Sequence, residues 1–266
     1  MLYALGAIGI IIAVWIVLCA PAWTRLRARS WRKTAFAHRG LHGPDCPENS
    51  IAAFTQACIA GYGFELDIQM TKDGHLVVFH DDDAARMTGH AGLIRDMTLS
   101  EVRALRLSGT DERIPTFSEV LHCTSGRVPM LIEIKSAPNV GAITELTVKH
   151  LKGYTGRYLI ESFDPLSLFW LKKNAPEVVR GFLVMPYREY RKTQGVFASF
   201  IVSLLMTNVL TRPDFVAHSY KMHHNPSLWL CREVFKTPMA QWTIRDRAKT
   251  DALIRRGEMP IFEQID

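Results

Sequence analysis

Apolar and charged residues alternate strictly in one stretch of the first half of the chain. Phe64, Leu66 and Ile68 are separated by Glu65 and Asp67. A period of two is that of a β-strand, and it puts both carboxylates on the same face. The pattern therefore predicts a strand with one apolar and one doubly anionic face.

Three other short apolar runs predict strands that lead to reactive side chains. β-Branched and aromatic residues dominate these runs, as is typical of strands. The runs, with the reactive residues at or just beyond their ends, are 35–37 with His38, 77–79 with His80, and 130–134 with Glu133 and Lys135. The candidate chemistry therefore lies where strands end.

The second half of the chain alternates between helical and strand-like patterns. The strands predicted there cover residues 158–160, 179–184, 214–217 and 239–243. With the four earlier strands they make eight, and this alternation predicts an α/β fold, a parallel sheet closed into a (β/α)8 TIM barrel. Barrel enzymes carry their sites at the carboxyl ends of the strands, where the reactive residues fall. The turn at Lys72-Asp73-Gly74 is too short to include a helix, so the relative direction of the strands around it stays open.

Helix starts can be read at three places. Ser50 is the expected N-cap of a helix that ends near Gly61. The long connection over residues 82–129 contains two more, one opening at Thr98 to Glu101 with Ser100 as the expected cap, and one opening at Thr116 to Glu119.

Residues 1–23 carry no charged side chain and consist largely of apolar residues. This length suffices to cross a hydrocarbon core, so the pattern predicts an N-terminal transmembrane helix as a membrane anchor. A basic linker over residues 24–34 follows, with Arg25, Arg27, Arg29, Arg32 and Lys33. The positive-inside rule then predicts a single-pass protein of the cell membrane whose main domain, residues 35–266, is cytoplasmic. A cleaved signal peptide is the alternative, although its charge would be expected at the start.

The charge and the cysteines fit this arrangement. The chain has a formal net charge of +6, but five of its cations lie in the linker just described. The excess charge therefore favours anionic lipid rather than nucleic acid as a partner. The five cysteines include no Cys-x-x-Cys pair, which favours a reducing compartment.

A second apolar stretch covers residues 196–210. It is interrupted only by Ser, Thr and Asn, and Arg188, Arg191 and Lys192 precede it. It is short for a membrane span, so two interpretations are open. It is either a barrel helix buried on one side or, with its basic lead-in, a membrane-facing segment over residues 188–210 that rests on the bilayer.

The acidic residues at the predicted strand ends suggest a metal site. Glu65, Asp67 and Glu133 supply three carboxylates and no thiolate. Such a set favours one hard divalent cation, Mg²⁺ or Ca²⁺, over zinc. Without a cation between them, the carboxylates would raise one another's pKa.

Two histidines and two cations complete the set. His38 and His80 remain for proton transfer, because histidine titrates closest to neutrality. Arg39 and Lys135 are donors suited to a phosphate. Each residue alone has a simpler explanation, such as a solvated strand edge or a hydrogen-bonded structural histidine. Their coincidence at the ends of separate strands favours a catalytic site.

An ordered series of motifs resembles the glycerophosphodiester phosphodiesterase family. The motifs are His38-Arg39-Gly40, Pro47-Glu48-Asn49-Ser50 with Ala53-Phe54, Glu65-Leu66-Asp67, Thr71-Lys72-Asp73-Gly74, Phe79-His80-Asp81, Ile114-Pro115-Thr116 and Glu133-Ile134-Lys135. A weaker likeness continues through Ser162-Phe163-Asp164 and Trp242-Thr243-Ile244 to Ile261-Phe262-Glu263. The resemblance thus covers roughly residues 35 to 263. It also makes residues 82–129 an insertion beside the mouth of the site.

The resemblance implies metal-dependent hydrolysis of a glycerophosphodiester to an alcohol and glycerol phosphate. The two histidines would share acid and base catalysis, and the substrate's own glycerol hydroxyl is a possible attacker in this family. Its expected substrate and phosphate contacts here are Arg39, Lys135, Glu48 and Trp242. The family commonly has an Asn where Arg245-Asp246 stands here, a departure that bears on the substrate.

Other functions are compatible with the sequence. A lysophospholipase D-like enzyme, or one that cleaves a phosphoglycerol polymer at the membrane, would use the same residues. A catalytically silent membrane scaffold would be expected to show a broken motif, and none of the core residues is missing. His218, His223 and His224 resemble metal ligands but lack partners at a useful spacing, so we interpret them as loop residues with substrate contact as the alternative.

Overall fold

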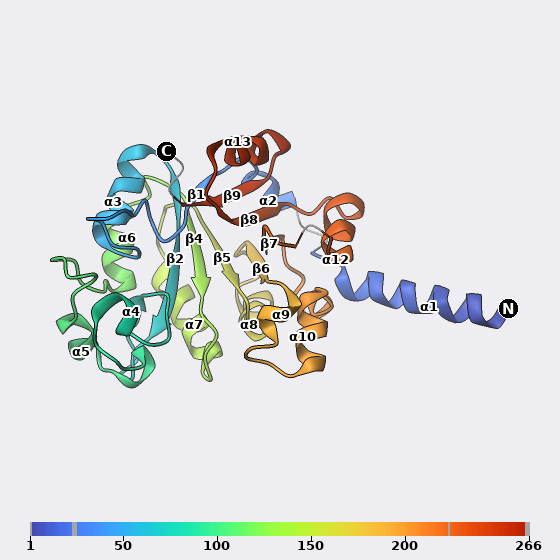
Figure 1. Cartoon of the computed structure of the whole chain (residues 1–266), viewed down its shortest axis with the longest axis horizontal. Helices are drawn as coiled ribbons and strands as arrows, with labels where there is room; N and C mark the ends of the chain where they lie inside the picture. The colour runs from blue at the N-terminus through green and yellow to red at the C-terminus, as the bar shows by residue number, and fades with distance from the viewer. Residues whose placement is uncertain (1, 23–25, 223, 264–266) are drawn as a thin grey trace.

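Eight parallel strands close into a barrel in the computed structural model, which describes residues 2–22, 26–222 and 224–263. In chain order the barrel strands are β1 Phe36–Ala37, β2 Gly63–Met70, β4 Met130–Ile134, β5 Tyr158–Ser162, β6 Arg180–Val184, β7 Phe215–Ser219, β8 Met239–Ile244 and β9 Met259–Phe262. Strand β1 pairs with both β9 and β2, which closes the ring (Figure 1). The predicted (β/α)8 barrel is confirmed.

One predicted barrel strand is wrong. Strand β3, Leu76–Val78, pairs antiparallel with the end of β2 and lies outside the ring. The turn between them is too short for a crossover, which takes a dozen or more residues when strands are parallel. The eighth barrel strand is β9, whose residues entered the sequence analysis only as a weak motif.

Helix caps explain where several helices begin. Helix α3, Ile51–Ala60, starts at Ser50, whose side chain accepts a hydrogen bond from the backbone of Ala53, and ends at Gly61 as expected. Helix α5, Leu99–Ala104, starts at Thr98 rather than at the expected Ser100. Thr98 is the N-cap because its hydroxyl and the Glu101 carboxylate form a reciprocal capping box.

The remaining helices surround the barrel or lie in its connections. They are α2 Leu26–Arg29, α4 Ala85–Thr88, the 3-10 helix η1 Ile94–Asp96, α6 Phe117–Thr124, α7 Val140–Leu151, α8 Pro165–Asn174, α9 Tyr187–Tyr190, α10 Val196–Ser203, α11 Asn208–Thr211, α12 Pro226–Trp229, the π-helix η2 Leu230–Val234 and α13 Arg247–Arg256. The connection after β3 carries its own apolar cluster, which includes Phe79, Met87 and Val102. Helix α6 packs beside α3.

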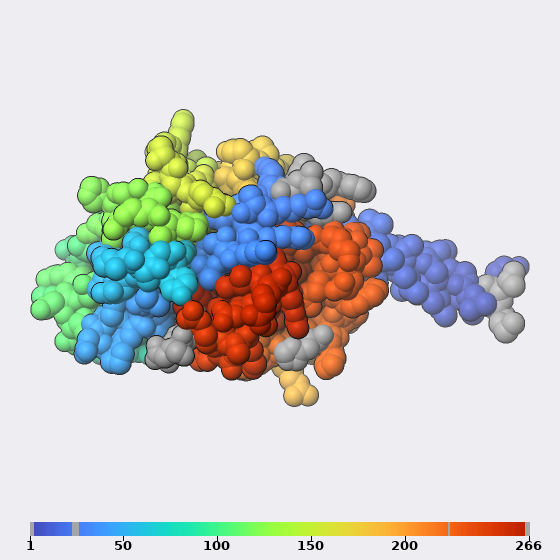
Figure 2. Space-filling model, turned by 90° about the horizontal axis from the view of Figure 1, so that it is seen from above, coloured from blue at the N-terminus to red at the C-terminus, as the bar shows by residue number. Residues whose placement is uncertain are grey.

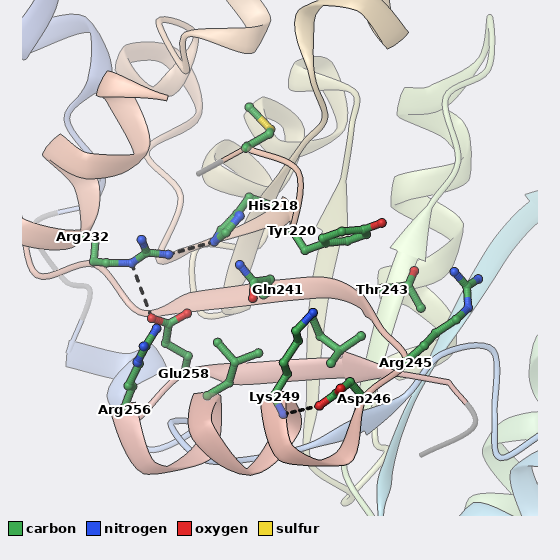
Figure 3. A pocket seen from close by; sticks show the side chains of 13 residues that line it. His218, Tyr220, Arg232, Gln241, Thr243, Arg245, Asp246, Lys249, Arg256 and Glu258 are labelled. Carbon is green, nitrogen blue, oxygen red and sulfur yellow. Dashed lines mark hydrogen bonds and ion pairs between the residues drawn. The ribbon is translucent and has the colours of Figure 1, made fainter. Parts of the chain in front are cut away.

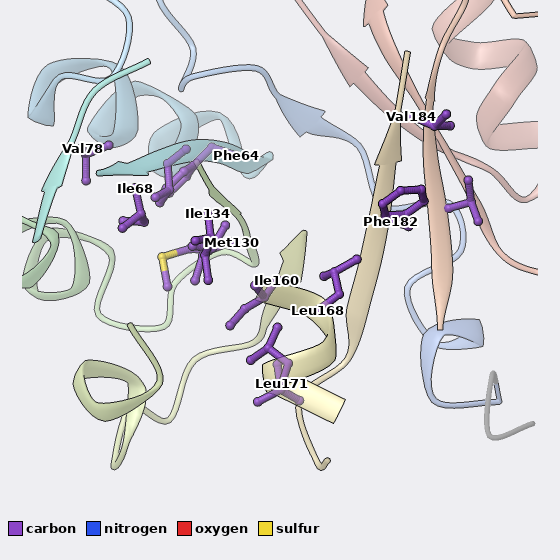
Figure 4. Close-up of a cluster of buried hydrophobic side chains, with 14 of the residues drawn as sticks. Phe64, Ile68, Val78, Met130, Ile134, Ile160, Leu168, Leu171, Phe182 and Val184 are labelled. Carbon is purple, nitrogen blue, oxygen red and sulfur yellow. The ribbon is translucent and has the colours of Figure 1, made fainter. Parts of the chain in front are cut away.

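Two apolar layers hold the barrel together. Outward-facing residues of the strands, such as Phe64, Met130 and Ile160, join Leu168 and Leu171 of α8 in the layer between sheet and helices (Figure 4). Inward-facing residues, among them Phe36, Leu131, Leu159, Phe215 and Ile261, form a second cluster. Because the outward positions of β2 are apolar, Glu65 and Asp67 point into the barrel.

Helix α1, Leu2–Cys19, projects from the body of the molecule (Figures 1 and 2). Its base is held by hydrogen bonds from Trp15 to Ser227 and from Asn208 to the Cys19 carbonyl. A transmembrane helix over residues 1–23 was predicted here, and its first and last residues lie outside the described part of the chain. None of the described helices is long and apolar enough for a bilayer crossing. The structure therefore does not support the predicted span.

The apolar stretch 196–210 forms α10, a turn and α11. Val202 is buried, whereas Val196, Phe197 and Phe200 are 61%, 75% and 49% exposed. One side of the segment thus packs on the barrel and the other is an exposed apolar patch. Contact of this patch with a bilayer stays a prediction.

Candidate active site

Three carboxylates converge inside the barrel. Glu65 and Asp67 lie on β2, and Glu133 lies on β4 as the register partner of Asp67. All three are buried, and one oxygen of each lies within 4.8 Å of the others. The predicted meeting of these carboxylates is confirmed.

The charges around the carboxylates favour a cation. Burial, with the charges of Asp67 and Glu133, raises the pKa of Glu65 well above its ordinary value. One oxygen of Glu65 is buried with no hydrogen-bond partner among the described residues. An unsatisfied oxygen in a ring of oxygen donors fits a hard divalent cation, which would favour the ionised form. The donor set therefore suits the predicted Mg²⁺ or Ca²⁺.

Lys135 lies among the same carboxylates. Its Nζ is 2.9 Å from Glu133 Oε1 and 3.3 Å from Asp67 Oδ1. Burial would raise the pKa of Asp67, but Lys135 and the nearby His80 and Arg39 hold it below its usual range. The structure thus places Lys135 beside the carboxylates and not at the outer rim.

The loop after β1 holds Arg39 over the carboxylates. Its backbone N–H donates to Glu65 Oε2 at 2.9 Å, and its Nη1 donates to Glu48 Oε1 at 2.7 Å. Gly40 has a φ of +84°, and an added Cβ would lie 2.7 Å from the Cβ of Ala53, so the loop accepts only glycine here. Glu48, predicted as a substrate contact, lies between Arg39 and Arg86.

His38 is held by a carboxylate that the sequence analysis did not assign. Its Nδ1 is 2.5 Å from Glu263 Oε1, and the other oxygen of Glu263 is 2.6 Å from Arg245. Burial would raise the pKa of Glu263, but His38 and Arg245 outweigh it and lower the pKa to about 2. A carboxylate at Nδ1 fixes the tautomer and turns Nε2 toward the cavity.

His80 has a parallel arrangement on the opposite segment. Its Nδ1 is 2.7 Å from Asp81 Oδ1, and Asp81 Oδ2 is 2.5 Å from Arg86. Burial lowers the pKa of His80, and the charge of Asp67 opposes this effect. Asp81 and Arg86 were not predicted as site residues, although Asp81 belongs to a quoted motif.

One cavity of about 250 Å³ is lined by both histidines, by Arg39 and by two of the three carboxylates. Its polar residues are His38, Arg39, Glu65, His80, Glu133, Glu161 and Thr243, and its apolar residues are Phe163, Leu183, Met185, Trp242 and Ile261. Trp242, predicted as a pocket residue, packs edge-on against Phe163 at 5.7 Å between ring centroids. Glu161 was missed, and its buried Oε2 has no partner among the described residues.

The family follows from a comparison with known sequences. A model of the glycerophosphoryl diester phosphodiesterase family matches residues 38–262. The chain belongs to this family. The match includes both histidines, all three carboxylates and Trp242, and it stops one residue short of Glu263.

Two relatives in this family are 34% and 41% identical to the chain over the aligned residues. A glycerophosphodiester phosphodiesterase of Caldanaerobacter subterraneus subsp. tengcongensis is 41% identical over 160 residues, which is 55% of this chain and 65% of that protein. One from Bacillus altitudinis is 34% identical over 163 residues, covering 56% and 66%. The chain thus matches just under two thirds of these relatives' lengths.

Solved structures of the family have the same fold. A glycerophosphodiester phosphodiesterase from Thermotoga maritima aligns with a TM-score of 0.65 at 27% identity, covering 86% of this chain and 93% of that one. An Oleispira antarctica phosphodiesterase, whose structure is a complex with the product sn-glycerol-3-phosphate, aligns with a TM-score of 0.72 at 24% identity over 89% and 94% of the two chains.

Two of the three further candidate histidines, His218 and His224, do not line this cavity. His218 lies on β7, where Arg232 Nη2 is 3.0 Å from its Nε2. His223 lies outside the described residues. His224 lines a separate shallow pocket with Tyr187 and Phe200.

Proposed function

We propose that the chain hydrolyses glycerophosphodiesters to an alcohol and glycerol phosphate. The observation that carries this proposal is the pair of histidines, each with a carboxylate at Nδ1, that line one cavity with Glu65 and Glu133, two of the three converging carboxylates. The names of the relatives and the product bound to the Oleispira antarctica structure support the same substrate class.

Glu65, Asp67 and Glu133 would hold one divalent cation, Mg²⁺ or Ca²⁺. When bound, such a cation supplies Lewis-acid stabilisation to a phosphate oxygen. Arg39 has a backbone conformation with φ of +55° that keeps its guanidinium beside Asp67. Arg39 and Lys135 would bind phosphate oxygens as fixed positive groups.

The histidines move the protons. One Nε2 accepts the proton of the attacking hydroxyl, from water or the substrate's own glycerol, as its oxygen bonds to phosphorus. Attack by water gives glycerol phosphate directly, whereas attack by the glycerol hydroxyl gives a cyclic phosphate that water then opens to glycerol phosphate. The other Nε2 donates a proton to the alcohol oxygen as its bond to phosphorus breaks. The carboxylates of Glu263 and Asp81 stabilise each imidazolium while it carries the extra proton.

The direct test is turnover of glycerophosphocholine by the purified full chain. We expect release of glycerol phosphate in Mg²⁺ or Ca²⁺, loss of activity with chelator, and recovery on adding the metal back. Absence of turnover with either metal, or activity that is indifferent to chelator, would contradict the proposal.

A second candidate is action on lysophospholipids at a membrane surface, at the inner face of the cell membrane. Its support is the exposed apolar patch of Val196, Phe197 and Phe200 on α10. The five cysteines, all free in the structure, fit a reducing compartment.

Vesicles separate the two substrate classes. For the second candidate we expect the double variant Phe197→Ser/Phe200→Ser to lose binding to anionic vesicles while it hydrolyses soluble glycerophosphocholine normally. The variant Ile59→Ser is the matched control, because Ile59 is 71% exposed on α3. Equal vesicle binding by the double variant and this control would exclude the α10 patch.

A further inference from the structure

A second cavity lies on the other side of strand β8, outside the barrel. It has a volume of about 620 Å³ and is bounded by β7, β8, η2 and α13 (Figure 3). Its size is that of pockets that hold small organic ligands. Its lining shares only Thr243 and no carboxylate with the catalytic cavity.

The side chains here depart from the usual pattern of a barrel wall. Lys249, Leu253 and Arg256 are spaced i, i+4 and i+7 along α13 and line the cavity together. Of these three residues only Leu253 belongs to the core, whereas Lys249 and Arg256 on either side of it are exposed. The sheet is polar at the same place, because Gln241 of β8 and His218 of β7 line the cavity. Polar groups in both layers indicate a site rather than failed packing.

The cavity has more positive than negative charge. Arg232, Arg245, Lys249 and Arg256 face two carboxylates, Asp246 and Glu258. Asp246 Oδ1 accepts the backbone N–H of Lys249 at 2.7 Å. Glu258 Oε1 is 3.5 Å from Arg232 Nε, and the buried Oε2 of Glu258 has no hydrogen-bond partner among the described residues.

Two of the cations lie outside the ion pairs of the described residues, although the charge of Arg256 still acts on Glu258. Arg245 is paired with Glu263, whereas Lys249 and Arg256 form no ion pair with a carboxylate in the described part of the chain. Cations in a concave, partly shielded cleft focus the field and concentrate anions there.

Neutral donors surround the Lys249 end of the cavity. Figure 3 shows Lys249 rising from α13 toward the wall that carries Gln241, with Tyr220 and Thr243 around the same opening. An amide, two hydroxyls and an ammonium group that line one cavity offer hydrogen-bond donors suited to the several oxygens of a phosphate. We propose that this outer cavity binds a phosphate ester, with Lys249, Gln241 and Tyr220 on the phosphate and Arg256 adding long-range attraction.

The outer cavity is one strand away from the catalytic groups. Thr243 lines both cavities, and Arg245 of the outer one holds Glu263, which holds His38. Two sources of the phosphate fit this position. It is either a separate phosphorylated small molecule or a second phosphate of an extended substrate, and the latter source rests on the proposed function.

Calorimetric titration of the full chain with inorganic phosphate and with glycerol phosphate tests the site. The test variant is Lys249→Gln/Arg256→Gln, and the control is Arg247→Gln/Arg255→Gln, which removes two charges from the same helix at residues that do not line the cavity. We expect the test variant to bind the probe at this site about ten- to hundredfold more weakly, and the control to bind like wild type. Equal binding by all three proteins, or equal weakening in both variants, would overturn the site.

Steady-state kinetics then distinguishes the two possible sources of the bound phosphate. It does not test whether the site exists, which the titration does. If the phosphate belongs to the substrate, the test variant raises KM for a compound with two phosphodiester groups and leaves KM for glycerophosphocholine unchanged. If the ligand is a separate molecule, both KM values stay at wild type while the titration still shows the loss. Because the titration requires no turnover, failure of the hydrolase proposal would leave its result intact.

Discussion

The two cavities on either side of strand β8 have opposite charge. The inner cavity gathers Glu65, Glu133 and Glu161 in about 250 Å³, whereas the outer cavity gathers four cations in about 620 Å³. Alternation along one strand creates the difference, because Trp242 faces inward and Gln241 lines the outer side. The charges of the inner cavity thus favour binding of a cation, and those of the outer cavity favour binding of an anion.

They also differ in how firmly their side chains are held. In the inner cavity each histidine has a carboxylate at Nδ1, and each such carboxylate has an arginine behind it. In the outer cavity Lys249 and Arg256 have no such partners in the described chain. The ion pairs of the inner cavity hold the histidines in the position that proton transfer needs. Cations without an ion pair are available to a ligand that binds reversibly.

The largest effect should follow loss of a histidine. His38→Ala or His80→Ala should each lower kcat on glycerophosphocholine by about 10²–10⁴-fold, because each removes a proton-transfer group. The control is His90→Ala, an exposed histidine that does not line either cavity. Thermal unfolding should show all three variants folded. Wild-type turnover in both His38→Ala and His80→Ala would remove the inner cavity from the catalytic account.

A smaller effect should follow loss of the carboxylate behind His38. Glu263→Gln should lower kcat by about 10²-fold, since a neutral amide holds the ring but does not stabilise its imidazolium form. KM should stay unchanged, because Glu263 does not line the cavity.

The control for Glu263→Gln is a similar substitution in the outer cavity. Glu258→Gln removes a buried carboxylate that pairs with Arg232, and it should leave kcat near the wild-type value. Equal losses in Glu263→Gln and Glu258→Gln would show that kcat responds to general destabilisation and not to the contact with His38.

Acid stability gives a further test of the Glu263 contacts. The folded pKa of Glu263 is about 2, below the ~4.3 of an unfolded glutamate. Its ionised form therefore stabilises the fold fully above the unfolded pKa, and this stabilisation is lost as pH falls toward 2. Between pH 5 and pH 3, thermal unfolding of Glu263→Gln should shift less than that of wild type. A shift equal to or larger than that of wild type would contradict the depressed pKa.

The smallest expected effect is the change of phosphate affinity with ionic strength. Phosphate binding in the outer cavity should weaken as ionic strength rises, because the exposed cations Lys249 and Arg256 are screened. The unfolding temperature should depend less on ionic strength, since the carboxylates of Glu65, Asp67, Glu133 and Glu161 are buried. Salt-independent phosphate binding would argue against a charge-driven site.

The sequence predicted the inner cavity best where strand periodicity decides the side-chain direction. The alternation around Glu65 and Asp67 fixed both on the inner face, and the register with β4 brought Glu133 beside them. The barrel followed from the alternation of strands and helices. The prediction counted β3 instead of β9 as a barrel strand, because a hairpin strand and a barrel strand have the same local pattern.

The partners of the histidines were harder to predict. Glu263 lies far along the chain from His38, and only the closure of β1 on β9 brings them together. Glu161 was missed because the predicted strand stopped at residue 160, whereas β5 continues to Ser162. The cations of α13 resemble an ordinary solvated helix face until the packing direction is known. Chain topology, which local patterns do not determine, decides each of these cases.

Counting bound metal tests the central claim most directly. The full chain, equilibrated with Mg²⁺ or Ca²⁺ and then desalted or dialysed against a fixed free concentration, should bind one divalent ion, and Asp67→Asn and Glu133→Gln should each lose both that ion and activity. Lys249→Gln should retain both. One ion per chain that disappears with the inner carboxylates is the predicted result, and full metal binding or full activity in Asp67→Asn would contradict it.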